Sequence, residues 1–271
     1  MAPAGANTGA NGLRIGLAAR LALRELRGGL SGFYIFLACV ALGTGAIAGV
    51  NSVSQMMTGS IASEGQTILG GDIRFESDNQ DIGEAERAYV EELGTVSSGL
   101  NMRTMARKPD GSDQSLVELR AVDDVYPLYG GFETVPPMPL DELFAESDGS
   151  YGAAVAQIFL DRLDLSVGDT VLVGEASLEI RGVITAEPDS LSEGFGFAPR
   201  LMMSREGLEA AGLIRPGSLV EYSYRVRLDD GADARDLAAL RADATSRFPD
   251  AGWSIRTSQN AAPSLTRNIE R

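Results

Sequence analysis

The chain has 271 residues, 44% of them apolar, with 23 basic and 38 acidic side chains and no histidine. This length and composition suffice for one large or two modest folded domains and exclude disorder over the whole chain. The net charge of -15 would repel phosphate groups, so no nucleic acid partner is expected.

Side chains that common catalytic sites need are scarce. Without histidine, neither a Ser-His-Asp nor a Cys-His arrangement can form, and zinc loses its commonest ligand. Cys39 is the only cysteine, which excludes an intrachain disulfide and a thiolate metal cluster. The P-loop pattern GxxxxGK[ST] is absent. We therefore expect no catalytic, cofactor or metal residues, and we interpret the pairs Asp123–Asp124 and Asp229–Asp230 as solvated loop charges.

Residues 1–30 are expected to be a cytoplasmic tail followed by a short helix at the membrane surface. The first dozen residues have the composition of a disordered tail. After them, Arg20, Arg24 and Arg27 recur at helical spacing among leucines, which predicts an amphipathic helix with arginines near lipid headgroups. An ordinary helix continuous with the next segment is the alternative.

Residues 31–69 are predicted to be a transmembrane helix that continues as an extracytoplasmic stalk. Phe33 to Val50 lacks charge, and about 20 apolar residues cross a bilayer. Residues 1–55 carry a net charge of +3 against -18 in the rest, which favours a cytoplasmic N-terminus and an exported, periplasmic main domain in a bacterial inner membrane. A signal peptide cleaved after Ala48 and a soluble core helix are the alternatives, but the apolar pattern continues past Ala48 to Leu69.

A stripe of small residues follows one side of this predicted helix. The spacings of three and four residues place them on one face, and one pair among them has the GxxxG pattern that brings membrane helices close together. The stripe predicts contact with partner helices, although alanine and glycine are common enough here to align by chance. Its members are Ala38, Ala41, Gly45, Ala48, Gly49 and Ser52.

Residues 70–130 read as a β-α-β-β block. Asp72–Glu76 alternates as a half-buried strand does, and a helix at Ala85–Leu93 follows, closed by Gly94. Two extended runs, Thr95–Arg107 and Ser115–Val122, are joined by KPDGSDQ, whose Pro-Asp-Gly favours a hairpin turn.

Residues 218–258 read as a second block, β-α-β. It has an alternating strand at Ser218–Leu228, a helix at Asp233–Phe248 and a short strand at Trp253–Arg256. Two such blocks with their helices on one face of a shared sheet predict an α+β, ferredoxin-like domain.

Residues 131–217 are expected to form an inserted β-rich subdomain. The pattern predicts a helix at Ala153–Leu163, a hairpin at Val167–Thr185, a strand at Ala198–Ser204 and a helix at Arg205–Ala211. We interpret Gly194–Phe197 as a flexible loop, with a ligand-contacting tip as the alternative. Residues 259–271 read as the start of a second stalk or transmembrane helix.

Several long strings then resemble the FtsX/MacB-like ABC transporter permeases, particularly those encoded near a periplasmic lysophospholipase or thioesterase. The strings, from about Leu13 onward, are ELRGGLSGFYIFLACVALG, ILGGDIRFE, LVELRAVDDVYPLYG, LSVGDTVLVG, FAPRLMMS, RPGSLVEYSYRVRL and FPDAGW. The resemblance implies a first transmembrane helix with a stalk, and porter-like halves in the periplasm around a β-rich insert. It also implies mechanotransmission, in which a separate ATPase subunit uses ATP inside the cell and stalk helices carry the motion outward.

On this resemblance we expect the N-terminal part of a permease that handles lipid-like or hydrophobic compounds in the cell envelope. The implied partners are an ABC ATPase subunit, the remaining permease helices or a second copy, membrane lipids, and a periplasmic lysophospholipase or thioesterase. The family carries further spans and a second periplasmic domain, whereas this sequence stops where the second span is expected. A membrane-anchored periplasmic scaffold that regulates an envelope enzyme is the alternative function, and a soluble exported binding protein would require cleavage at Ala48.

Overall fold

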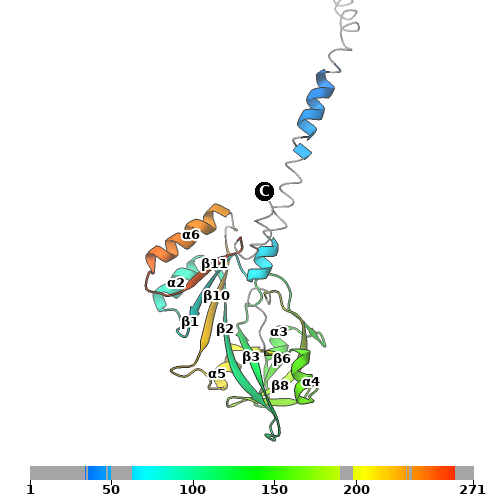
Figure 1. Ribbon diagram of the computed structural model, residues 1–271, viewed down its shortest axis with the longest axis vertical. Coiled ribbons are helices and arrows are strands. Elements are labelled where there is room, and N and C mark those ends of the chain that lie inside the picture. The colour runs from blue at the N-terminus through cyan, green and yellow to red at the C-terminus, as the bar shows by residue number, and fades with distance from the viewer. Residues whose placement is uncertain are drawn as a thin grey trace, which may run out of the picture. The chain divides into compact units, whose positions relative to one another are not determined.

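In a computed structural model, the chain consists of two compact units, residues 1–59 and 60–271 (Figure 1). The structure describes residues 34, 36–46, 48–49, 63–189, 198–229, 231 and 234–259. Four of the residues expected at the membrane, Arg20, Arg24, Arg27 and Ser52, lie outside these ranges. So do the Gly194–Phe197 loop and the helix expected after residue 259.

In the first unit, residues 36–46 are helical. Large apolar side chains on this segment are exposed, among them Phe36, Leu37 and Leu42, while the Thr44 hydroxyl donates a hydrogen bond of 2.8 Å to the carbonyl oxygen of Val40. Among the described residues, no helix combines the length and apolarity needed to cross a membrane. The transmembrane helix therefore stays a prediction.

The second unit begins with helical residues 63–69 and contains a split β-α-β sheet. Four strands in the order β11-β1-β10-β2 pair antiparallel, and two helices, α2 and α6, lie beside one another on one face (Figure 1). This order interleaves the two blocks expected from the sequence and confirms the α+β class. The bounds are β1 Ile73–Asp78, α2 Glu84–Glu92, β2 Gly94–Arg107, β10 Val220–Leu228, α6 Ala234–Arg247 and β11 Ser254–Thr257.

Apolar side chains of alternate strand positions fill the space under the two helices. The Phe75 ring lies 4.9 Å from the Trp253 ring, measured between centroids, and the Tyr89 hydroxyl on α2 donates to Asp243 on α6 over 3.0 Å. Since side chains alternate across a strand, the polar residues between these apolar ones face the opposite side of the sheet.

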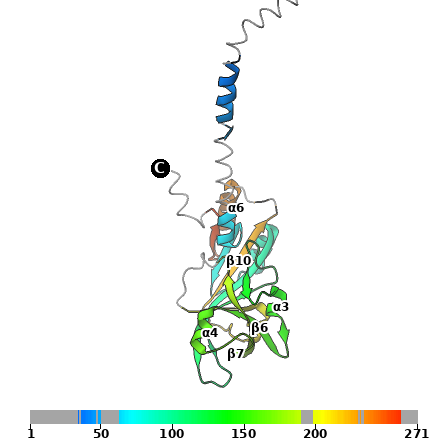
Figure 2. The ribbon, with the colours of Figure 1, turned by 90° about the vertical axis from the view of Figure 1, so that its right-hand side faces the viewer.

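Beyond β2 the same sheet closes into a ring of six hydrogen-bonded strands, β2-β3-β9-β6-β8-β7, because β7 pairs both with β8 and back with β2. Short strands β4 and β5 extend the sheet beside β8 and β6, and Figure 2 shows α3 and α4 beside β6. The bounds are β3 Gln114–Val122, β4 Glu133–Val135, α3 Leu140–Phe144, β5 Glu146–Ser147, β6 Ser150–Val155, α4 Gln157–Leu163, β7 Thr170–Val173, β8 Ala176–Ala186, β9 Arg200–Ser204 and α5 Arg205–Ala210.

The hairpin of β2 and β3 and the helices predicted at residues 85–93, 205–211 and 233–248 are confirmed within one residue, while the first strand of the second hairpin begins at Thr170, three residues later than expected. The helix expected at Ala153–Leu163 is wrong in its first turn, because residues 150–155 form strand β6 and the helix begins at Gln157. The cause is tertiary: β6 lies between β8 and β9 with Ala153 and Ala154 fully buried, and pairing on both sides outweighs the helix propensity of alanine. The boundaries at residues 131 and 217 stay a prediction.

Candidate functional site

The face of the sheet opposite α2 and α6 is lined by charged side chains. The strand register places Arg74 of β1 beside Arg225 of β10, and Asn101 of β2 beside Arg120 of β3. All three of these arginines are at most 1% exposed. Burying a guanidinium is unfavourable unless a carboxylate accompanies it, so the partners of these arginines define the site.

Asp189 is the carboxylate at the centre of this face. It is fully buried and accepts two hydrogen bonds from Arg120, at 2.9 and 2.5 Å. Arg225 forms an ion pair with it at 2.7 Å, and the Tyr126 hydroxyl donates to it over 3.3 Å. We call Asp189, Arg120, Arg225 and Tyr126 the buried charge cluster.

The electrostatics keep this cluster ionised. Burial by itself would raise the pKa of Asp189, but the guanidinium groups of Arg225 and Arg120 outweigh burial and hold that pKa well below its usual range. Burial raises the pKa of the Tyr126 hydroxyl above its usual range, and its ring lies 4.8 Å under the Arg120 guanidinium, which adds a cation–π contact. Asp189 is therefore an anion fixed between two cations.

The segment that carries Asp189 directly follows β8 and is fastened at a second position. Glu187 pairs with Arg120 at 2.5 Å and with Arg200 at 3.3 Å. Arg120 belongs to β3, Arg200 to β9 and Arg225 to β10. The end of β8 is thus held to three other strands by ionic contacts.

Helical residues 63–69 enter the domain against the same cluster. At the end of this helix, Gly70 has φ of +75°, and a Cβ atom placed on it would lie 2.8 Å from Cδ of Arg225 and 3.1 Å from a carboxylate oxygen of Asp189. Glycine tolerates both this left-handed backbone and the close approach. Next to it, buried Asp72 accepts hydrogen bonds from Gln66 Nε2 at 2.7 Å, from the Tyr129 hydroxyl at 3.1 Å and from the Leu228 amide at 2.8 Å.

Two further contacts surround the point where the helix joins β1. Gly130 lies between Pro188, in the loop after β8, and Thr67 of the helix. A Cβ atom placed on Gly130 would lie 2.6 Å from Pro188 and 3.0 Å from Thr67. The Ser258 amide, just after β11, donates to the carbonyl of Asp72 over 2.9 Å. We call residues 63–72 together with Tyr129, Gly130 and Ser258 the junction.

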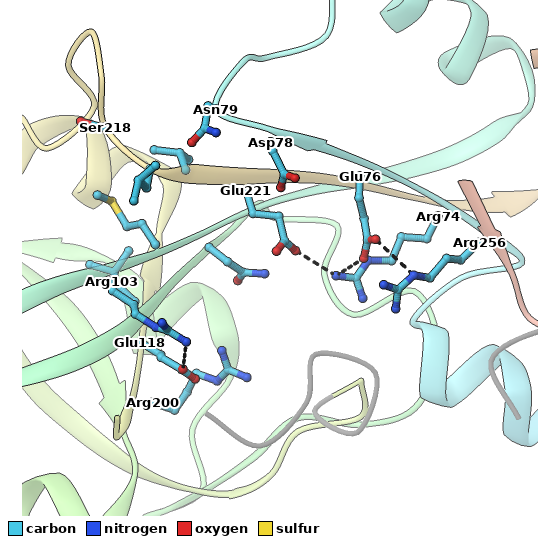
Figure 3. Close-up of a pocket in the computed structure, with 15 residues that line it drawn as sticks. Arg74, Glu76, Asp78, Asn79, Arg103, Glu118, Arg200, Ser218, Glu221 and Arg256 are labelled. Atoms are coloured by element: carbon cyan, nitrogen blue, oxygen red, sulfur yellow. Dashed lines mark hydrogen bonds and ion pairs between the residues drawn. The ribbon is translucent and has the colours of Figure 1, made fainter. Parts of the chain in front are cut away.

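A pocket of about 690 Å³ lies on the same charged face (Figure 3). Arg74 pairs in it with Glu76 at 2.8 Å, Glu76 pairs with Arg256 at 3.3 Å, and Arg103 pairs with Glu118 at 3.4 Å. Its charged lining residues are Arg74, Arg103, Arg200, Arg256, Glu76, Asp78, Glu118 and Glu221. Four cations and four anions balance, so the pocket does not select ligands by net charge. In the part of the chain that the structure describes, no group of three or more metal-ligating side chains occurs.

The small residues singled out in the sequence lie in the first unit. Ala38, Ala41, Gly45, Ala48 and Gly49 are exposed, and a Cβ placed on Gly45 or Gly49 would have nothing within 4 Å. The described residues of the stripe therefore do not test whether it packs against a partner helix, and the helix-packing stripe stays a prediction.

The residues of the buried charge cluster and the junction were missed by sequence reasoning. Alternation in LVELRAV and SLVEYSYRVRL assigns Arg120 and Arg225 to a solvent face, and only the acidic string Glu187-Pro188-Asp189 after a strand hints at their partners. The interpretation of Asp123 as a solvated loop charge is wrong. Asp123 accepts hydrogen bonds from Ser97 and Ser98, which connect the end of β3 to β2. Asp124 and Asp229 are exposed as expected.

Comparison with known proteins identifies the family to which the chain belongs. The model of the MacB-like periplasmic core domain matches residues 34–243. The uncharacterized ABC transporter permease YbbP of Escherichia coli K12 is 31% identical over 190 residues, which are 69% of this chain. The chain spans only 22% of the length of that relative.

Among solved structures, the chain is similar to the periplasmic region of MacB from Actinobacillus actinomycetemcomitans, with a TM-score of 0.46 and 12% identity over 76% of this chain and 96% of that one. It is also similar to the extracellular domain of the noncanonic ABC-type transporter YknZ from Gram-positive bacteria, with a TM-score of 0.44 and 10% identity over 66% of this chain and 90% of that one. Because the family model covers well over half of its residues, the chain belongs to the MacB-like periplasmic core domain family, as the resemblance to FtsX/MacB-like ABC transporter permeases predicted.

Proposed function

We propose that the chain is the N-terminal part of an ABC transporter permease that transmits motion across the membrane. Residues 31–69 form a transmembrane helix and stalk, the N-terminus is cytoplasmic, and the α+β domain lies in the periplasm. A separate ATPase subunit supplies the energy, and the compounds handled in the envelope are lipid-like or hydrophobic. Family membership supports the permease, and the charge asymmetry of +3 against -18 supports the orientation.

One observation carries the mechanical part of this proposal. Helical residues 63–69 do not lead into the domain through a flexible linker, since Gln66 bonds to buried Asp72 and Gly70 lies against buried Arg225 and Asp189. The chain leaving β11 at Ser258 is bonded to the same place through Asp72. A displacement of this helix is therefore passed to the sheet instead of being absorbed by a loop.

The orientation is tested by labelling single cysteines with a membrane-impermeant maleimide in cells whose inner membrane is intact. Cys39 is first replaced by alanine, and Ser166→Cys then places a thiol in an exposed loop of the ring. We expect Ser166→Cys to be labelled in cells whose outer membrane is permeabilised, and the control Ala10→Cys to be labelled only after lysis. The opposite pattern, or a soluble periplasmic protein beginning at Gly49, would overturn the proposal.

Coupling to an ATPase requires a second experiment. The chain is expressed within its whole permease together with an ABC ATPase encoded beside it, and the membrane complex is purified through a tag on the permease. We expect the ATPase to co-purify and its hydrolysis rate to depend on the permease. Recovery of the permease alone in mild detergent would contradict the proposed partner.

A further inference from the structure

The segment Glu187–Asp189 has contacts on both of its sides. On one side it continues β8, which pairs with β6, β7 and β4 in the ring region. On the other side it meets the junction at two separate positions: Asp189 lies beside Gly70, and Pro188 lies beside Gly130, which in turn touches Thr67. No other route between helix 63–69 and β8 is as direct among the contacts described above.

Both positions where the segment meets the junction are glycines with φ near +75°. At each of them a single methyl group would overlap the neighbouring side chain. Gly70 is buried, and its close packing leaves no slack, because displaced atoms in a dense interior push on their neighbours. A shift of the helix therefore acts on Arg225 and Asp189 directly.

We propose that Asp189 couples the stalk helix to the ring of strands, so that displacement of residues 63–70 moves the end of β8 through the Arg225–Asp189–Arg120 contacts. This inference rests on the proposed function, in which the helix moves. Separating Asp189 from its two arginines would remove from these buried guanidinium groups the carboxylate that they share, which is unfavourable. The buried charge cluster consequently moves as one body, and Asp189 is a positioning residue that acts through Arg225 and Arg120.

The coupling predicts a reciprocal effect that a merely stabilising residue would not produce. If the junction and the end of β8 are linked through Asp189, loosening either one must loosen the other by the same free energy. Hydrogen–deuterium exchange of the full chain in detergent micelles measures both ends at once, and it needs neither an ATPase nor a transported compound.

Four variants make the comparison. Asp189→Asn removes the charge from the β8 side, and Gly70→Ala displaces Arg225 from the junction side. The matched control is Glu175→Gln, which removes a carboxylate from the exposed pair of Glu175 with Arg215. Arg225→Lys retains the positive charge and serves if Asp189→Asn fails to fold.

We expect Asp189→Asn to accelerate exchange in residues 63–71 about tenfold or more beyond its effect on α6, which reports the overall loss of stability. Gly70→Ala should accelerate exchange in residues 183–189 by a similar factor, and Arg225→Lys should accelerate both. Glu175→Gln should leave exchange in residues 63–71 and 183–189 as it is.

In Asp189→Asn, acceleration by the same factor in residues 63–71, β1, β10 and α6 would show only a general loss of stability and overturn the coupling. An effect at one end without its reciprocal would also overturn it. Reversed cysteine labelling would defeat the proposed function while leaving this exchange result intact, so the two failures are distinguishable.

Discussion

Gly65 packs directly against the backbone carbonyl of Ser258. A Cβ atom at position 65 would overlap that oxygen, so the helix before β1 and the chain after β11 touch backbone to backbone. Two segments that are nearly two hundred residues apart in the sequence thus meet where the domain begins.

We predict that Gly65→Ala destabilises the domain even though alanine favours helices by about 1 kcal/mol over glycine. The added methyl group must displace Ser258, and overpacking of this kind costs about 1–3 kcal/mol. Urea unfolding followed by circular dichroism measures the change. Gly131→Ala is the control, because a Cβ there meets nothing within 4 Å; equal midpoints for the two variants would contradict the predicted contact.

Asp189→Asn should reduce the free energy of unfolding by about 3–5 kcal/mol, since it leaves Arg120 and Arg225 buried beside a neutral amide. The matched control is Glu175→Gln, which breaks the exposed pair of Glu175 with Arg215 and should cost less than about 1 kcal/mol. Both are measured by thermal and urea unfolding. A cost at position 189 as small as that at position 175 would refute the importance of the buried ion pairs.

Acid should weaken the fold partly through Asp189. Because its pKa is lowered in the folded state, the carboxylate stabilises the protein above its unfolded-state pKa of about 4, and this contribution is lost as the pH falls toward the lower folded pKa. The difference in unfolding free energy between wild type and Asp189→Asn should therefore shrink below about pH 4. Asp124→Asn, at an exposed position, provides the reference, and a difference that is constant from pH 7 to pH 3 would speak against this linkage.

Alkali should act at the junction through Tyr129. Burial and the nearby Asp72 raise the pKa of Tyr129 to about 12, so the neutral hydroxyl stabilises the fold below its unfolded pKa of about 10, and this contribution is lost as the pH rises from about 10 to about 12. Tyr129→Phe should cost about 1 kcal/mol at pH 7 through the lost hydrogen bond to Asp72. It should also reduce the decline in stability above pH 10, which pH-dependent urea midpoints would reveal.

The small-residue stripe gives a prediction about association. If it faces partner helices, Gly45→Leu introduces a side chain where backbones approach and should weaken association by about 1–3 kcal/mol. Ala46→Leu, about 100° around the helix, should have little effect. A membrane two-hybrid assay compares the two at nearly equal hydrophobicity, and identical results would reduce the stripe to chance.

The strands and helices were predictable because their signals are local. Alternation in DIRFE and SLVEYSYRVRL, and the Pro-Asp-Gly turn, act within a few residues. The buried charge cluster was not predictable, because the carboxylate that pairs with buried Arg120 lies 69 residues further along the chain. From local alternation, an arginine between apolar residues looks solvent-exposed; only the fold brings Asp189 over it.

The prediction that the helix begins at Ala153 was wrong for a related reason. Small residues satisfy both helix propensity and close packing between strands, and Gly152 lies so close to the Leu143 carbonyl that a Cβ would overlap it. The position of β6 between β8 and β9 is decided by contacts that the local sequence does not contain.

Strand β2 is shared by two parts of the sheet without a break in register. Gly94–Met102 pairs with β10 and Gly99–Arg107 pairs with β3, while Ala106 and Arg107 also pair with β7. Removing residues 131–217 would leave the far half of β2 without β7, and β3 without β9. Buried Ala106 and Val117 would then face water beside unpaired backbone groups. Residues 131–217 are consequently not a detachable module, and a chimera that exchanges them must carry the tips of β2 and β3 with them.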